Sequence, residues 1–199
     1  MIDIFINGGP LMYPILCCSV IGWAIFLERI RTYRRMRRGM LPLLSQVREL
    51  LLAKHTAQAV SYCQECGSPL ARILLAVLTA KKSNRSQIKE LADEVGSRET
   101  VELQRYLGLL ATIANISPLL GLLGTVLGMI EAFNVIAKVG SGTPATLGGG
   151  ISEALITTAA GLSVAVPMIL IHRYLSSRAD RLALEMEEYT MQIVDLVVE

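Results

Sequence analysis

The chain has 199 residues, of which 52% are apolar and only 18% carry a charge. Soluble globular proteins have about 25% charged residues, and a net charge of +2 is too small to indicate binding to nucleic acid. Three stretches of at least 24 positions contain between them a single charged residue, Glu153. A bilayer core requires about 20 apolar residues in a helix. The composition therefore excludes a soluble enzyme, a secreted disulfide-linked protein and a disordered chain.

The first apolar stretch, residues 11–27, follows a short external N-terminal segment, residues 1–10, that ends in Gly8, Gly9 and Pro10. A signal peptide is not expected, because residues 1–10 contain no lysine or arginine. Arginines follow the stretch instead, within ten residues: Arg29, Arg31, Arg34, Arg35, Arg37 and Arg38. This stop-transfer pattern predicts an external N-terminus and a cytoplasmic arginine-rich flank.

Residues 28–105 are predicted to form a helical cytoplasmic region. Apolar residues at three- and four-residue spacing predict an amphipathic helix near its start: Leu43, Leu44, Val47, Leu50 and Leu51. The apolar stretch 70–80 is too short to span a bilayer and is predicted to be a buried helix. No helix breaker lies between Ile88 and the second span. We therefore expect one long helix that starts in the cytoplasm and continues through the membrane.

The second span is predicted at residues 106–130 and the third at 148–171, with an external loop at 131–147 between them. Basic residues after the third span place the C-terminal segment, residues 172–199, in the cytoplasm. That segment is expected to extend the third span, because apolar residues share one helical face: Leu182, Met186, Tyr189, Ile193, and Leu196 or Val197. The predicted fold class is all-α, an integral membrane protein with three transmembrane helices, N-terminus outside and C-terminus inside.

Small residues and prolines mark the second and third spans. The helix-packing or hinge candidates are Pro118, Gly121, Gly124, Gly128, Gly161 and Pro167. The three glycines of the second span fall on one face and include a GxxxG spacing, which is typical of closely packed membrane helices. The two prolines interrupt the helical hydrogen-bond ladders. They are either packed kinks or flexible joints, and the sequence leaves both open.

Glu153 is the main candidate functional residue, because a charge within a span costs roughly 2.5–3.5 kcal/mol unless it faces protein or water. The alternative is an interfacial carboxylate near the start of the third helix, favoured by the helix dipole. At about 1.5 Å per residue, Thr125 and Glu153 lie about 9–10 Å outside the midplane, and Thr157 and Thr158 about 3–5 Å outside it. This polar band fits a hydrated path or a seat for a partner. Helix geometry alone pairs Glu153 with Thr157, about 40° away, rather than with Thr158, about 140° away.

Glu153 is the only acid predicted within a span, so a partner is expected to supply a second titratable group. The sequence contains no GxxxxGK[ST], HExxH or GxSxG motif. We therefore expect no enzymatic activity, no catalytic residue, no metal and no cofactor. Cys63 and Cys66 form an isolated CxxC without further ligands. They are interpreted as reduced thiols on a helix, with a redox or metal role as the alternative.

Two runs of sequence resemble the MotA/TolQ/ExbB proton-channel family, most strongly its ExbB and TolQ branch. They are Ala114–Phe133, which contains Leu-Leu-Gly-Thr-Val-Leu-Gly, and Gly149–Pro167, which contains Ile-Ser-Glu-Ala-Leu-Ile-Thr-Thr. The resemblance is specific over about residues 107–174 and implies pore-lining roles for Thr125, Glu153 and Thr158. Since geometry favours Thr157, both neighbouring threonines stay candidates.

The resemblance also implies partners and a location. It implies a ring subunit, a pentamer around two copies of a single-span ExbD- or TolR-like protein, in the bacterial inner membrane. Protons would be the coupling ion, and a TonB- or TolA-like protein a further partner. Three spans instead of four argue against a flagellar role, whereas an ExbB-like or a TolQ-like task, and protons or sodium, both remain open.

A structural scaffold is the alternative to a motor subunit. In this interpretation the glycines of the second span assemble a helical membrane oligomer that conducts no ions. Glu153 then acts as a helix cap.

Overall fold

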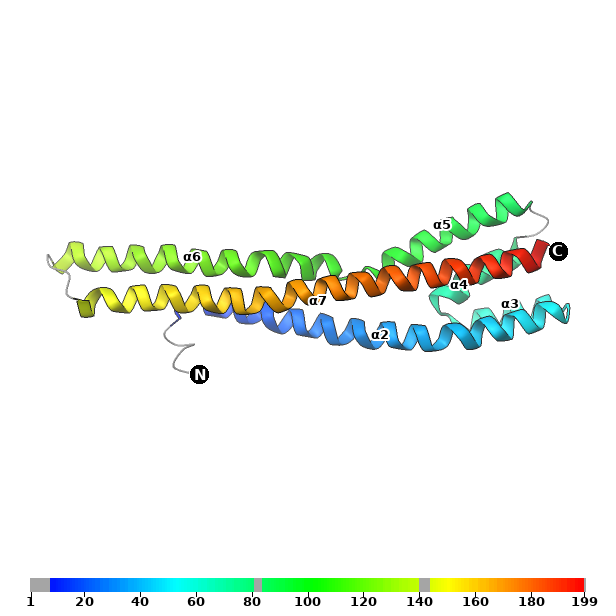
Figure 1. Cartoon of the computed structure of the whole chain (residues 1–199), viewed down its shortest axis with the longest axis horizontal. Coiled ribbons are helices and arrows are strands. Elements are labelled where there is room, and N and C mark those ends of the chain that lie inside the picture. Colours follow the sequence, from blue (N-terminus) through cyan, green and yellow to red (C-terminus); the bar gives the residue numbers. More distant parts are fainter. Residues whose placement is uncertain (1–7, 81–83, 140–143, 199) are drawn as a thin grey trace. The chain divides into compact units, whose positions relative to one another are not determined.

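The computed structural model describes residues 8–80, 84–139 and 144–198. Its helices are α2 (Met12–Leu52), α3 (Thr56–Cys66), α4 (Pro69–Thr79), α5 (Arg85–Leu103), α6 (Leu107–Val139) and α7 (Pro144–Val198) (Figure 1). The described residues form no β-strand, so the all-α prediction is confirmed for this part of the chain. Three helical stretches are long and apolar enough to cross a membrane: α2, α5 together with α6, and α7.

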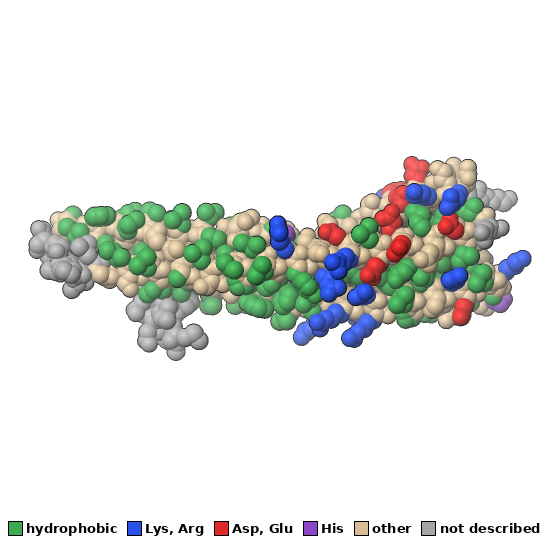
Figure 2. All heavy atoms as spheres, viewed as in Figure 1, with side chains coloured by type: hydrophobic (Ala, Val, Ile, Leu, Met, Phe, Trp, Pro, Cys, Tyr) green, Lys and Arg blue, Asp and Glu red, His purple; other side chains and the backbone are tan. Residues whose placement is uncertain are grey.

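The chain divides into two compact units. The first contains Met1–Leu27 and Tyr106–Tyr174, and the second contains Glu28–Arg105 and Leu175–Glu199. The visible surface of the first unit is mostly hydrophobic, whereas Lys, Arg, Asp and Glu side chains gather on the second unit (Figure 2). The first unit thus holds the three predicted spans, and the second holds the predicted cytoplasmic region and tail.

The first unit exposes large apolar side chains around its helices. On α6 these include Leu119, Leu122, Leu123, Val126, Leu127, Met129, Ile130 and Phe133. Soluble proteins rarely expose an apolar surface of this extent. Lipid or neighbouring protein is therefore the environment that suits this unit.

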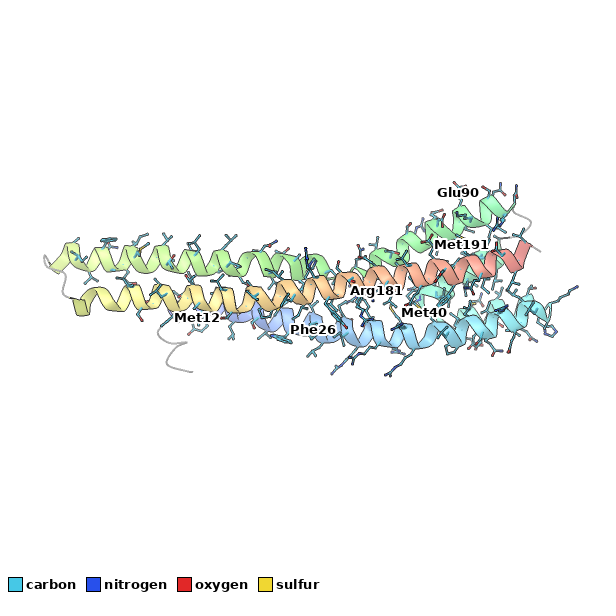
Figure 3. All side chains as sticks on the ribbon, viewed as in Figure 1. Met12, Phe26, Met40, Glu90, Arg181 and Met191 are labelled. Carbon is cyan, nitrogen blue, oxygen red and sulfur yellow. The ribbon has the colours of Figure 1, made fainter. Side chains whose placement is uncertain are left out.

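The second unit has a core of aliphatic side chains from α2, α4, α5 and α7: Leu43, Val47, Leu70, Leu74, Val77, Leu103, Leu175, Met186 and Ile193. The amphipathic helix predicted around Leu43 is confirmed, and so is the short buried helix, which is α4. Met40, labelled in Figure 3, continues the buried face of α2. The predicted extension of the third span is also confirmed, because α7 is one helix to Val198.

Ion pairs join the helices of the second unit. Arg72 of α4 lies 2.7 Å from the buried Glu99 of α5. Arg37 of α2 lies 3.6 Å from Glu185 of α7. The Arg72–Glu99 pair has the larger structural role, because removing the arginine would leave a buried carboxylate without its charge partner.

The prediction of one uninterrupted helix from Ile88 through the second span is wrong. α5 ends at Leu103 and α6 begins at Leu107, and Tyr106 between them has a φ of +66°. The Tyr33 hydroxyl of α2 donates a 2.7 Å hydrogen bond to the Leu103 carbonyl. Arg29 donates a longer one, 3.4 Å, to the Glu102 carbonyl. The break is possible because side chains of α2 satisfy carbonyls that a continuous helix would have bonded itself.

The loop predicted at residues 131–147 is also shorter than expected. The backbone is helical to Val139 and again from Pro144, and residues 140–143 lie outside the described part. Residues 131–137 include apolar side chains that continue the helical pattern of α6, and the sequence contains no proline or glycine between 129 and 139. The helix therefore has no local reason to stop at the predicted edge of the span.

Candidate functional site

Glycines bring α6 and α7 of the same chain into close contact. A Cβ atom built on Gly161 would lie 2.5 Å from the carbonyl oxygen of Ser117, and one built on Gly128 would lie 2.8 Å from that of Gly150. Backbone cannot move aside as a flexible side chain can. These positions require glycine because the two backbones approach closely, as small residues permit in membrane helices.

Gly121 and Gly124 of α6 face the threonine pair of α7. A Cβ atom on Gly124 would lie 2.5 Å from Cγ2 of Thr157, and one on Gly121 would lie 3.0 Å from Cα of Thr158. Gly121, Gly124 and Gly128 thus share one face, as their spacing predicted. This face is covered by α7 of the same chain.

Pro118 and Pro167 both lie inside continuous helices, α6 and α7. Ser117, next to the first proline, is buried and donates a 2.8 Å hydrogen bond to the Ile113 carbonyl. The structure does not interrupt either helix at its proline. Whether the two prolines act as joints stays a prediction.

Thr157 is buried, with 1% of its surface exposed. Its hydroxyl oxygen lies 2.8 Å from the carbonyl oxygen of Gly8 and 2.8 Å from that of Glu153. A hydroxyl has one hydrogen to donate. Thr157 therefore divides its hydrogen bond between its own helix and the turn that precedes α2.

Thr158 and Thr125 also bond to backbone. The Thr158 hydroxyl donates a 2.9 Å hydrogen bond to the Gly121 carbonyl of α6, so it links the two helices. The Thr125 hydroxyl donates a 2.6 Å hydrogen bond to the Leu122 carbonyl of its own helix. In this single chain all three threonines have their hydroxyl hydrogens committed. A pore-lining role for them stays a prediction.

Glu153 lies in a groove of about 460 Å³ within the first unit. The groove is lined by three residues that precede α2, Gly8, Pro10 and Leu11, and by Glu153 and Thr157 of α7. Seven residues of α6 complete it: Gly124, Leu127, Gly128, Ile130, Glu131, Asn134 and Val135. The polar lining groups are two carboxylates, one amide and one hydroxyl. Such groups can pass a proton between them through water, or bind a complementary polar group of another chain.

Glu131 was not predicted as a site residue, because it falls one position beyond the predicted second span. The structure places it on α6 in the same groove as Glu153. A sequence signal was available. The glycine face of α6 continues directly to Glu131. Counted from Gly124, positions on this face recur at offsets of four, seven and eleven residues, which are Gly128, Glu131 and Val135.

The second unit offers little evidence of redox or metal chemistry. The described residues include no group of three or more His, Cys, Asp and Glu side chains arranged to hold a metal ion. Burial, and secondarily the nearby Cys66, raises the pKa of the Cys63 thiol to about 11. Because the thiolate is the reactive form, Cys63 has little nucleophilic character near neutral pH.

Three long apolar helical stretches, two of which pack closely around polar and ionisable side chains, define a multi-pass membrane protein. The comparison with protein families is more specific. Residues 65–188 match the MotA/TolQ/ExbB proton channel family, and the chain belongs to this family.

Relatives of the chain fall in the ExbB and TolQ branch. It is 32% identical over 195 residues to the biopolymer transport protein exbB1 of Vibrio cholerae, covering 96% of this chain and 85% of the relative. It is 30% identical over 181 residues to an ExbB homologue described as a biopolymer transport protein in Methanothermobacter thermautotrophicus. That match covers 90% of this chain but 64% of the relative's length. The Tol-Pal system protein TolQ of Pseudomonas aeruginosa is 43% identical over 86 residues, covering 43% of this chain and 37% of that protein.

Proposed function

We propose that the chain is the ring subunit of a motor in the bacterial inner membrane, driven by the proton motive force. It energises an outer-membrane or envelope process through a single-span partner of the ExbD or TolR kind. Membership of a proton channel family supports this proposal, as do relatives named for biopolymer transport and for the Tol-Pal system. The proposal includes a pentamer, an external N-terminus and a cytoplasmic second unit, and it requires no cofactor besides the transported proton.

The groove that contains Glu153 and Glu131 is the observation that carries the proposal. Glu131 and Asn134 are exposed and Glu153 is half-buried, in a unit whose exposed side chains are mostly apolar. Ionisable groups at membrane level are stable only when they face protein or water. A hydrated path completed by a second chain satisfies this requirement, and the aspartate of the partner is the group we assign to it.

The packing of the glycines weakens the scaffold alternative. That alternative used the glycine face of α6 to join separate copies of the chain. In the structure this face is already covered by α7, with Gly128 against Gly150 and Gly121 against Thr158. The glycines therefore build the subunit itself, and association between copies has to use other surfaces.

Co-expression tests the proposed complex. The chain is expressed with a single-span protein that has an aspartate near the start of its span, chosen from a neighbouring reading frame, and the complex is weighed by native mass spectrometry. We expect a pentamer that retains a partner dimer. A homo-oligomer that never retains the single-span protein would contradict the proposal.

A further inference from the structure

The turn before α2 contacts the two α7 residues that sequence reasoning singled out. The carbonyl of Gly8 accepts the 2.8 Å hydrogen bond from Thr157. The carbonyl of Gly9 accepts a 3.2 Å hydrogen bond from the amide of Met12, so the turn leads directly into the helix. Figure 3 labels Met12 at this point of the chain. The turn is therefore fixed at one end by α2 and at the other by α7.

Gly9 has no space for any larger residue. Its φ is +69°, a backbone conformation that residues with a Cβ rarely adopt. A Cβ atom at this position would overlap the Oε1 atom of Glu153 and lie 2.9 Å from its carboxyl carbon. The carboxylate thus lies where the side chain of residue 9 would be.

Gly8 is enclosed in the same way. A Cβ atom at this position would lie 2.6 Å from Cγ of Met12 and 3.2 Å from Cγ2 of Ile156. Ile156 lies on α7 between Glu153 and Thr157. Gly8 is therefore enclosed by apolar side chains, whereas Gly9 lies against the Glu153 carboxylate.

The electrostatics of the contact are also favourable. The amides of Met12 and Tyr13 are bonded to the carbonyls of Gly9 and Pro10, and the aligned peptide dipoles give this end of α2 a partial positive charge. The Glu153 carboxylate is placed beside that end. An anionic side chain is stabilised at such a position by interaction with the helix terminus.

We propose that the Gly8–Gly9 turn is a positioning element that covers the Glu153 carboxylate and fixes Thr157 on the groove. Because the Thr157 hydroxyl has one hydrogen, releasing the turn transfers that hydrogen bond fully to the Glu153 carbonyl and uncovers the carboxylate. A role of this release in proton movement rests on the proposed function, whereas the contact between the turn and Glu153 is independent of it.

Carbodiimide labelling measures whether the turn covers Glu153. Membranes containing the full-length protein are treated with dicyclohexylcarbodiimide, and labelling of Glu153 and of Glu131 is followed by peptide mass spectrometry. Gly9→Ala is compared with Gly67→Ala, since Gly67 also has a positive φ, +55°, but no atom within 4 Å of its Cβ position. Gly9→Ala is expected to speed Glu153 labelling about three- to tenfold, the range that loss of one hydrogen-bonded contact allows. Glu131 labelling and the Gly67→Ala variant are expected to match the wild type.

One further variant keeps the proposal testable if Gly9→Ala does not accumulate. Thr157→Val removes the hydrogen bond that holds Gly8 without changing the residues of the turn, so the turn is released and Glu153 labelling is expected to be faster. Its matched control is Thr158→Val, which loses a hydrogen bond to Gly121 instead. Where Gly9→Ala does accumulate, combining it with Glu153→Asp shortens the side chain that would overlap the new methyl group and is expected to recover slow labelling at position 153.

Either of two results would overturn the proposal. One is a Glu153 labelling rate unchanged in both Gly9→Ala and Thr157→Val. The other is equal acceleration by Gly67→Ala or Thr158→Val, which would indicate general loosening. Because labelling requires no partner and no ion flux, this result is independent of whether the chain proves to be a motor subunit.

Discussion

At the scale of single residues, the threonines of the first unit show that residue type alone does not reveal which partner a side chain bonds to. Thr157 and Thr158 are neighbours, yet one bonds to the turn before α2 and the other to α6. Their direction along α7 follows from helical geometry and could be predicted. Their partners could not, because the partners are backbone carbonyls of distant segments, which carry no sequence signal.

The two cysteines of the CxxC motif differ in a way that can be measured. Cys63 is buried, with its pKa raised to about 11, and Cys66 is exposed. At pH 8 the thiolate fraction of Cys63 is about one in a thousand, and it rises as the pH approaches the raised pKa. We expect maleimide to label Cys66 rapidly and Cys63 slowly at this pH. Replacing Cys17, Cys18 and Cys66 together by serine leaves Cys63 as the single cysteine, and rapid labelling of that variant at pH 8 would show that Cys63 is not protected.

At the scale of elements, the long helices follow the sequence pattern closely, but the ends of the helices do not. Composition and hydrophobic periodicity predicted α4, the amphipathic part of α2 and the continuation of α7. The break between α5 and α6 was missed because its cause is not local. Tyr33 and Arg29 cap α5 from about 70 positions away in the sequence.

The tyrosine cap gives a prediction for this break. Tyr33 is buried, and burial raises its pKa, so its hydroxyl remains a neutral donor near neutral pH. Tyr33→Phe leaves the Leu103 carbonyl without that donor and should destabilise the break by about 1 kcal/mol. Hydrogen exchange of the amides at residues 104–107 should then be faster. Tyr62→Phe is the control, because the Tyr62 hydroxyl has no hydrogen-bond partner among the described residues. Equal exchange rates in both variants would show that the Tyr33 hydroxyl does not stabilise the end of α5.

The glycine contacts give a second prediction at this scale. Gly161→Ala places a methyl group 2.5 Å from the Ser117 carbonyl oxygen, where neither backbone can yield without separating α6 from α7. Overpacking of this kind typically costs about 1–3 kcal/mol. Gly108→Ala on α6 is the control, since nothing lies within 4 Å of its Cβ position. Thermal unfolding of the purified protein in detergent should show a lower midpoint for Gly161→Ala alone, and equal midpoints would contradict the packing described.

At the scale of the whole molecule, the sequence determines the class of protein more securely than its site. Charge distribution and three apolar stretches predicted a membrane protein, and the resemblance of two runs of residues indicated the family that the comparisons then established. Glu131 was missed because the expected edge of a span was treated as the edge of the site. The groove is formed by the packing of α6 against α7 and the turn before α2, and it extends beyond residue 130 to Glu131, Asn134 and Val135.

Proton flux tests the central claim most directly. The chain is reconstituted in liposomes with its single-span partner, a membrane potential is imposed, and internal acidification is followed by a pH-sensitive dye. Glu153→Gln is expected to lower the flux at least about tenfold, as the loss of a group that takes part in proton transfer typically does. Glu90→Gln, an exposed change on α5 of the second unit, is expected to leave the flux unchanged. Undiminished flux in Glu153→Gln, at normal complex abundance, would contradict the account.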